Sequence, residues 1–97
     1  MAVEHIVLLE LNDGVTEEQV QAGLLALAGL KGKIPGLLDV KTGRNFTDRA
    51  GGISHAALMT MEDRDVLAGY GPHPAHQEVS KILGPCIKNL TVVDIEV

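Results

Sequence analysis

The stretch AVEHIVLLELNDGVTEEQ, residues 2–19, carries the pattern that decides the fold. Residues 2–11 alternate in the way that a β-strand requires. One face of this strand holds Val3, His5, Val7, Leu9 and Leu11, and the other holds Glu4, Ile6, Leu8 and Glu10. Both faces are largely apolar, so we expect both to be covered at least in part.

The polar end of the same stretch predicts a turn and then a helix. Asn12-Asp13-Gly14 has the composition of a turn. Thr16 and Gln19 have the spacing of a capping box, which marks a helix start. The apolar residues Val20, Leu24 and Leu27 follow at helical spacing. We expect this helix to run to about Lys31, where Gly32 and Pro35-Gly36 turn the chain.

The rest of the chain repeats these two kinds of element. Strands are predicted over residues 37–46, 53–61 and 90–97. Short helices are predicted over about 64–70 and from Pro74 onward, since proline suits the first turn of a helix. The resulting order is β-α-β-β-α-β.

This order predicts an α+β, ferredoxin-like fold in a single domain over residues 1–97. Right-handed crossovers give a four-stranded antiparallel sheet with both helices on one face and the first and third strands in the centre. The other face of the sheet is then apolar and uncovered. A second copy packed sheet to sheet is the simplest cover, so we expect a homodimer.

Composition narrows the function. The 97 residues include 13 acidic and 8 basic side chains, a balance that excludes the basic surface needed for nucleic acid. Cys86 has no cysteine partner, which fits a reducing compartment. The apolar run at the N-terminus carries Glu4 and His5 and is too short for a membrane span. We therefore expect a cytoplasmic protein without a membrane partner.

The stretch YGPHPAHQEV, residues 70–79, carries the groups most suited to chemistry. A neutral imidazole accepts protons at physiological pH, and a phenol stabilises negative charge that develops on an oxygen. We expect His76 to act as a general base and Tyr70 as the donor to a carbonyl or enolate oxygen. His5, His55 and His73 are candidate substrate-binding residues, because the predicted topology places the two strand histidines on one face as possible neighbours.

Each candidate also has a simpler interpretation. A histidine within a strand is often a core residue with satisfied ring nitrogens, which applies to His5 and His55. His73 has the position of a helix cap. His73 and His76 have a spacing that suits zinc or copper, but the sequence identifies no third ligand, so we expect no metal and no cofactor.

The segments EHIVLLEL, KIPGLLDVKTGRN, SHAALMTMED, YGPHPAHQEV and LTVVDIEV together resemble the stress-responsive dimeric α/β-barrel (Dabb) family across essentially the whole chain. The resemblance implies a ferredoxin-like protomer, a dimer whose two sheets close into a barrel, and a pocket between sheet and helices. The family includes heat-stable, stress-induced plant proteins and a polyketide cyclase that works by aldol condensation without metal or organic cofactor. The cyclase's base and its helping tyrosine match His76 and Tyr70, and its pocket histidines match His5 and His55.

Three functions therefore follow as expectations. The first is a cofactor-independent cyclase or lyase that acts on a polyketide-like or other carbonyl substrate. The second is a non-catalytic, stress-related binding or structural protein, and the third is a cofactor-free monooxygenase. Because the chain has one Phe, one Tyr and no Trp, we expect a pocket that is small or differently shaped from that of the cyclase.

Overall fold

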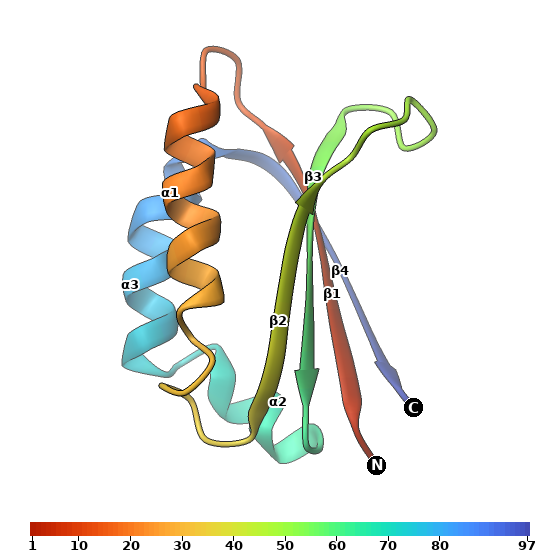
Figure 1. Ribbon diagram of the computed structural model, residues 1–97, viewed down its shortest axis with the longest axis vertical. Helices are drawn as coiled ribbons and strands as arrows, with labels where there is room; N and C mark the ends of the chain where they lie inside the picture. The colour runs from red at the N-terminus through yellow and green to blue at the C-terminus, as the bar shows by residue number, and fades with distance from the viewer.

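Strand β1, residues Val3–Leu11, is a central strand, as the apolar character of both its faces predicts. In the computed structural model, which describes residues 1–97, the sheet is antiparallel with the order β2-β3-β1-β4 (Figure 1). The other strands are β2, Leu37–Arg44, β3, Ile53–Met61, and β4, Ile87–Glu96. The expected ferredoxin-like βαββαβ arrangement is confirmed.

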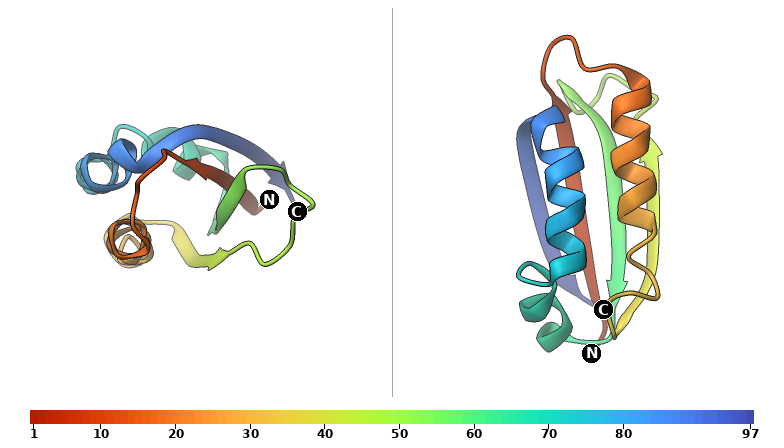
Figure 2. Two further views of the ribbon diagram at one scale, coloured as in Figure 1. Left: turned by 90° about the horizontal axis from the view of Figure 1, so that it is seen from above. Right: turned by 90° about the vertical axis from the view of Figure 1, so that its left-hand side faces the viewer.

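The two longer helices form one layer over one face of this sheet. Helix α1, Glu17–Ala28, and helix α3, Pro74–Leu83, lie side by side in front of the strands (Figure 2). Helix α1 begins with the predicted capping box, since the Thr16 hydroxyl accepts from the Gln19 backbone and the Gln19 side chain accepts from the Thr16 backbone. The short helix α2, Arg64–Tyr70, lies at the end of the sheet that also holds both termini (Figure 1).

The largest differences from the predicted boundaries, of three residues each, lie at the end of α1 and the start of β4, and β2 ends at Arg44 instead of 46. Helix α1 ends at Ala28 rather than near Lys31, because the Leu30 N–H bonds the Leu27 carbonyl and so tightens the chain into turns. Strand β4 begins at Ile87, three residues before the predicted start at 90, because the short 3-10 turn η1, Gly84–Cys86, already brings the chain beside β1.

The hydrophobic core lies between the helices and the inward face of the sheet. The inward residues of β1 and β3 alternate along each strand, as the period of two predicts. Helix α1 packs closely on α3: a Cβ placed on Gly23 would lie 2.6 Å from Cδ1 of Leu83. The absence of a side chain at Gly23 therefore lets the two helices pack closely in one layer.

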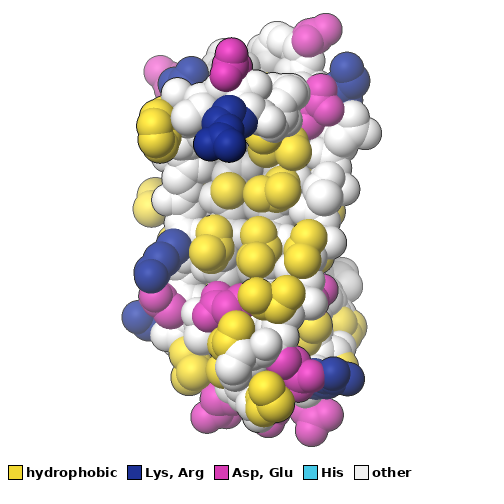
Figure 3. Space-filling model, turned by 90° about the vertical axis from the view of Figure 1, so that its right-hand side faces the viewer, with side chains coloured by type: hydrophobic (Ala, Val, Ile, Leu, Met, Phe, Trp, Pro, Cys, Tyr) yellow, Lys and Arg dark blue, Asp and Glu magenta, His cyan; other side chains and the backbone are white.

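The outward face of the sheet carries no helix and is apolar across its middle (Figure 3). Register and strand alternation place six aliphatic side chains there: Ile6, Leu8, Ala56, Leu58, Val93 and Ile95. Leu58, Val93 and Ile95 are each more than two-fifths exposed, at 41%, 45% and 44%. The apolar sheet face, as these six residues are called below, is thus unpartnered in a single copy.

None of the helices combines the length and the apolar character that are needed to cross a membrane.

Candidate active site in a cavity between helix α3 and the sheet

A cavity of about 240 Å³ lies between α3 and the inward face of the sheet. Ten of its fourteen lining residues are hydrophobic. The side chains that bring polar atoms to it are His5, Tyr70, His76 and Ser80. Leu90 and Val92 of the edge strand β4 also line it and are 54% and 42% exposed, so the cavity opens along this edge. A few polar groups in an apolar hollow are typical of a small-molecule site.

The cavity brings together three of the five residues that the sequence singles out. The ring centroids of Tyr70 and His76 lie 4.4 Å apart, with the planes tilted by 52°. The Tyr70 and His5 centroids lie 5.5 Å apart in an edge-on arrangement. One phenol is therefore in contact with two imidazoles.

Tyr70 is a neutral hydrogen-bond donor in this cavity. It is only 5% exposed, and burial raises the pKa of its phenol from the ordinary value of 10.0 to about 12. Its hydroxyl donates to Sδ of Met59 at 3.2 Å. A thioether is a weak acceptor, so a carbonyl oxygen that enters the cavity is a better partner for the same hydrogen.

The tautomer of His76 follows from its partner. Nδ1 lies 3.0 Å from the carbonyl oxygen of Gly71. A carbonyl only accepts, so Nδ1 carries the hydrogen and donates it. Nε2 of the neutral ring is then left with its lone pair. The residue that the sequence names as the base is therefore held in a form that can accept a proton.

His5 has a charged partner that the sequence analysis missed. Its Nδ1 is hydrogen-bonded to Oδ1 of Asp94 in β4. The two residues are directly paired across the β1–β4 ladder. A signal was available in the sequence, because Asp94 follows the apolar Leu90 and Val92 on the inward face of β4. An acidic residue in an otherwise apolar alternation needs a partner.

His55 shares the inward face with His5 but lies elsewhere on it, so the expectation that the two are neighbours is wrong. His5 pairs with Met59, whereas His55 pairs with Leu9 farther along β1. Antiparallel pairing thus sends the two histidines to opposite ends of the sheet. His55 is 1% exposed and does not line the cavity.

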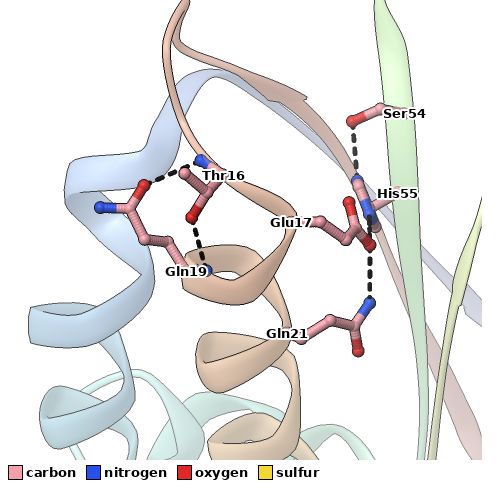
Figure 4. Close-up of polar contacts among 6 residues, drawn as sticks. All are labelled: Thr16, Glu17, Gln19, Gln21, Ser54 and His55. Carbon is pink, nitrogen blue, oxygen red and sulfur yellow. Dashed lines mark hydrogen bonds and ion pairs between the residues drawn. The ribbon is translucent and has the colours of Figure 1, made fainter.

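The partners of His55 come from its own strand and from the start of α1 (Figure 4). Its Nδ1 lies 2.7 Å from the Ser54 hydroxyl, and its Nε2 donates to Oε1 of Glu17 at 3.3 Å. Hydrogen bonds from Gln21 and from His55 lower the pKa of Glu17 below its ordinary value of 4.5. The cluster ties α1 to β3.

His73 lies outside the cavity and acts as the helix cap that the simpler interpretation describes. Its Nδ1 accepts from the Ala75 backbone N–H at 3.0 Å, at the start of α3. It lines a separate, open depression beside Pro35 and Gly36. No three His, Cys, Asp or Glu side chains lie close enough together to hold a metal ion.

Comparison with known proteins gives the geometry a family context. An uncharacterized protein of Streptomyces coelicolor is 39% identical over 77 residues, which cover 77% of this chain and 79% of the relative. Olivetolic acid cyclase of Cannabis sativa is 32% identical over 78 residues, which cover 78% of this chain and 77% of the cyclase.

A solved dimeric ferredoxin-like protein from Jannaschia sp. CCS1 is 28% identical and superposes with a TM-score of 0.85 over 100% of both chains. The family model of the stress-responsive A/B barrel domain, Dabb, matches residues 3–97. The chain therefore belongs to the stress-responsive A/B barrel (Dabb) family.

Proposed function

We propose that the protein is a cofactor-independent enzyme of the cyclase or lyase kind that acts on a small carbonyl compound. The observation that carries this proposal is the pair formed by Tyr70 and His76 in an otherwise apolar cavity, with ring centroids 4.4 Å apart. One member is a neutral phenol donor and the other an imidazole with a free Nε2. The 32% identity to a relative named as a cyclase supports the same class.

The chemistry that the pair supports is proton removal from a carbon next to a carbonyl. Nε2 of His76 accepts the proton, and the C–H electron pair moves into a new C=C bond as negative charge builds on the carbonyl oxygen. The Tyr70 hydroxyl turns from Met59 to that oxygen and stabilises the charge. The enolate then attacks a second carbonyl carbon, which closes a ring in a cyclase or, in reverse, releases a fragment in a lyase.

The size and lining of the cavity limit the substrate. An apolar cavity of about 150 Å³ holds benzene, and this one measures about 240 Å³. The lining side chains leave room for a ring with a short chain, while Leu90 and Val92 leave the β4 edge open. We therefore place the reacting carbonyl beside Tyr70 and any longer polar part of the substrate at the open edge.

Exchange of α-hydrogens for deuterium tests the proposal without knowledge of the natural substrate. Acetophenone is incubated with the protein in D₂O, and the loss of its methyl signal is followed by proton NMR. The wild-type protein should accelerate exchange, and His76→Gln should reduce the acceleration by at least about a hundredfold. His73→Asn is the matched control, since it changes the neighbouring histidine, keeps a helix-capping residue and leaves the cavity intact. Absence of any acceleration by the wild-type protein sinks the proposal.

The second candidate is a non-catalytic, stress-related binding protein. Its support is the predominance of hydrophobic side chains in the cavity and the 27% identity to a stress-response A/B barrel protein of Arabidopsis thaliana. On this alternative acetophenone binds, as seen by shifts of cavity resonances, while deuterium exchange stays at the uncatalysed rate. The two measurements on one sample separate the candidates.

We further propose that two copies pack through the apolar sheet face. Its six aliphatic residues are neighbours on the sheet, three of them exposed and three partly exposed in one copy, and such apolar patches usually mark an interface. The solved Jannaschia relative is described as dimeric, which supports a homodimer here. A twofold axis brings the same patch from each copy together.

A further inference from the structure

We propose that His5, held by Asp94, is a second proton-transfer group of the cavity and delivers a proton to a substrate oxygen while His76 removes one from carbon. The inference rests on the proposed function. It assigns the base of the proposed reaction to one histidine and the acid to another. It also assigns a positioning role to Asp94, a residue far in sequence from the stretch at 70–79. Both histidines contact the ring of Tyr70, so they act on the same bound molecule.

The open nitrogen of His5 is available to that molecule. Nδ1 is engaged by Asp94, and Nε2 has no hydrogen-bond partner. Every buried side-chain nitrogen or oxygen in the structure has a partner, so Nε2 is not a sealed core atom. His5 lines the cavity, so its unpartnered Nε2 is the ring nitrogen available to an incoming ligand.

The two histidines differ in the charge of the group behind them. His76 donates Nδ1–H to the uncharged carbonyl of Gly71. His5 donates Nδ1–H to the Asp94 carboxylate, which stabilises a positive ring in the way that a buried aspartate stabilises the imidazolium of a hydrolase. His5 is thus suited to hold a proton on Nε2 and donate it, and His76 is suited to accept one.

The proposed step conserves protons and electrons. Nε2 of His76 takes the α-proton, and the enolate carbon uses the freed electron pair to form a bond to the second carbonyl carbon. The π electrons of that carbonyl move to its oxygen, which takes the Nε2 proton of His5. His76 ends charged and His5 neutral, and water at the open edge returns the proton from one ring to the other.

The charged surroundings leave Asp94 as the group that governs His5. The titratable side chains near the ring are Asp94 from β4, Tyr70 from α2 and His76 from α3, while β3 contributes the uncharged Met59. Glu96, the next inward residue of β4, is paired with Arg64 of α2. The neighbouring carboxylate is therefore already engaged and provides a control for Asp94.

The experiment compares Asp94→Asn with Glu96→Gln in two measurements. The first is nitrogen-15 NMR of the imidazole nitrogens at about pH 7, which shows which ring nitrogen of His5 carries the hydrogen. Nδ1 should carry it in the wild-type protein and in Glu96→Gln, whereas Asp94→Asn should lose this preference, because an amide can also present N–H to Nδ1. The second is the retro-aldol cleavage of 4-hydroxy-4-phenyl-2-butanone, with acetophenone exchange measured alongside.

The expected result is cleavage slowed about a hundredfold in Asp94→Asn and acetophenone exchange slowed far less, because exchange ends at the enolate and does not use the proton shared with His5. His5→Gln should show the same difference between cleavage and exchange, and it serves as the second variant if Asp94→Asn does not fold. Wild-type cleavage rates in both variants, or exchange slowed as much as cleavage, overturn the role of His5. Wild-type exchange without cleavage overturns it too, but leaves the proposed function standing. Absence of wild-type exchange overturns both.

Discussion

Gly23 of α1 and Leu83 of α3 meet so closely that a methyl group on Gly23 would lie 2.6 Å from Cδ1 of Leu83. Leu83 is at the same time a wall of the cavity. The contact between the two helices therefore also fixes one side of the candidate active site, and this link is open to a direct test.

Gly23→Ala should destabilise the fold even though alanine is the better helix former. Added volume in a packed interface typically costs about 1–3 kcal/mol, which outweighs the gain of about 1 kcal/mol from helix propensity. Gly69→Ala in α2 is the matched control, since no atom lies within 4 Å of its added methyl. The free energy of unfolding measured in urea should be higher for Gly69→Ala than for the wild-type protein and lower for Gly23→Ala. Equal stabilisation by both substitutions would show that Leu83 yields freely.

The phenol of Tyr70 should titrate about two pH units above the ordinary pKa of tyrosine. The chain has one Tyr and no Trp, so phenolate absorbance reports this side chain alone. In the folded protein the midpoint should lie at about 12, because burial disfavours the phenolate, and in urea at the ordinary 10.0. Since the folded pKa is the higher one, this contribution to stability is complete below pH 10.0 and is lost as pH rises towards 12. A folded midpoint near 10 would mean that the cavity is wet at Tyr70.

Acid should weaken the tie between α1 and β3. The pKa of Glu17 in the folded protein lies below its ordinary value of 4.5, so the unfolded chain takes up a proton at Glu17 first. The contribution of Glu17 to stability is therefore present above about pH 4.5 and is lost as pH falls through the folded pKa. The melting temperature of the wild-type protein should therefore fall more steeply from about pH 5 to pH 3 than that of Glu17→Gln. Glu18→Gln, one residue along and without a hydrogen-bond partner, should keep the wild-type slope; parallel slopes for all three proteins would contradict the assignment.

Charge on the apolar sheet face should separate the proposed dimer. Leu58→Glu with Val93→Glu places four carboxylates in a twofold interface, where unpaired buried charges are strongly unfavourable. Sedimentation equilibrium should show a dimer for the wild-type protein and a monomer for the double variant. Leu25→Glu is the control, because Leu25 is 76% exposed on α1, away from this face. A wild-type monomer at micromolar concentration would refute the dimer.

The sequence was sufficient for the elements and their order, because each signal is local. Alternation along residues 3–11 and the capping box at Thr16 depend on neighbours within one turn or one strand. The relative position of His5 and His55 depends on the register between β1 and β3, which is set by side-chain packing between segments distant in the chain. For that reason the shared face was predictable, whereas the separation along it was not.

In the candidate site, too, contacts between residues close in sequence were predictable and contacts between distant segments were not. Tyr70 at the end of α2 and His76 at the start of α3 are close in sequence, so their contact follows from a local motif. Asp94 reaches His5 from the far end of the chain, and only the β1–β4 pairing brings the two together. For His73 the sequence left a substrate-binding role and a helix cap both open, and the hydrogen bond from the Ala75 backbone supports the cap.

Several walls of the cavity are also part of the buried hydrophobic core. Leu27, Met59, Val79 and Leu83 belong both to the buried core and to the lining of the cavity. Any substitution that reshapes the pocket for another compound therefore removes or adds volume in the core, at a typical cost of about 1–3 kcal/mol. In a chain of 97 residues that is a large share of the total. New specificity in this lineage should arise first at the half-exposed Leu90 and Val92, where selection can vary the lining without risking the fold.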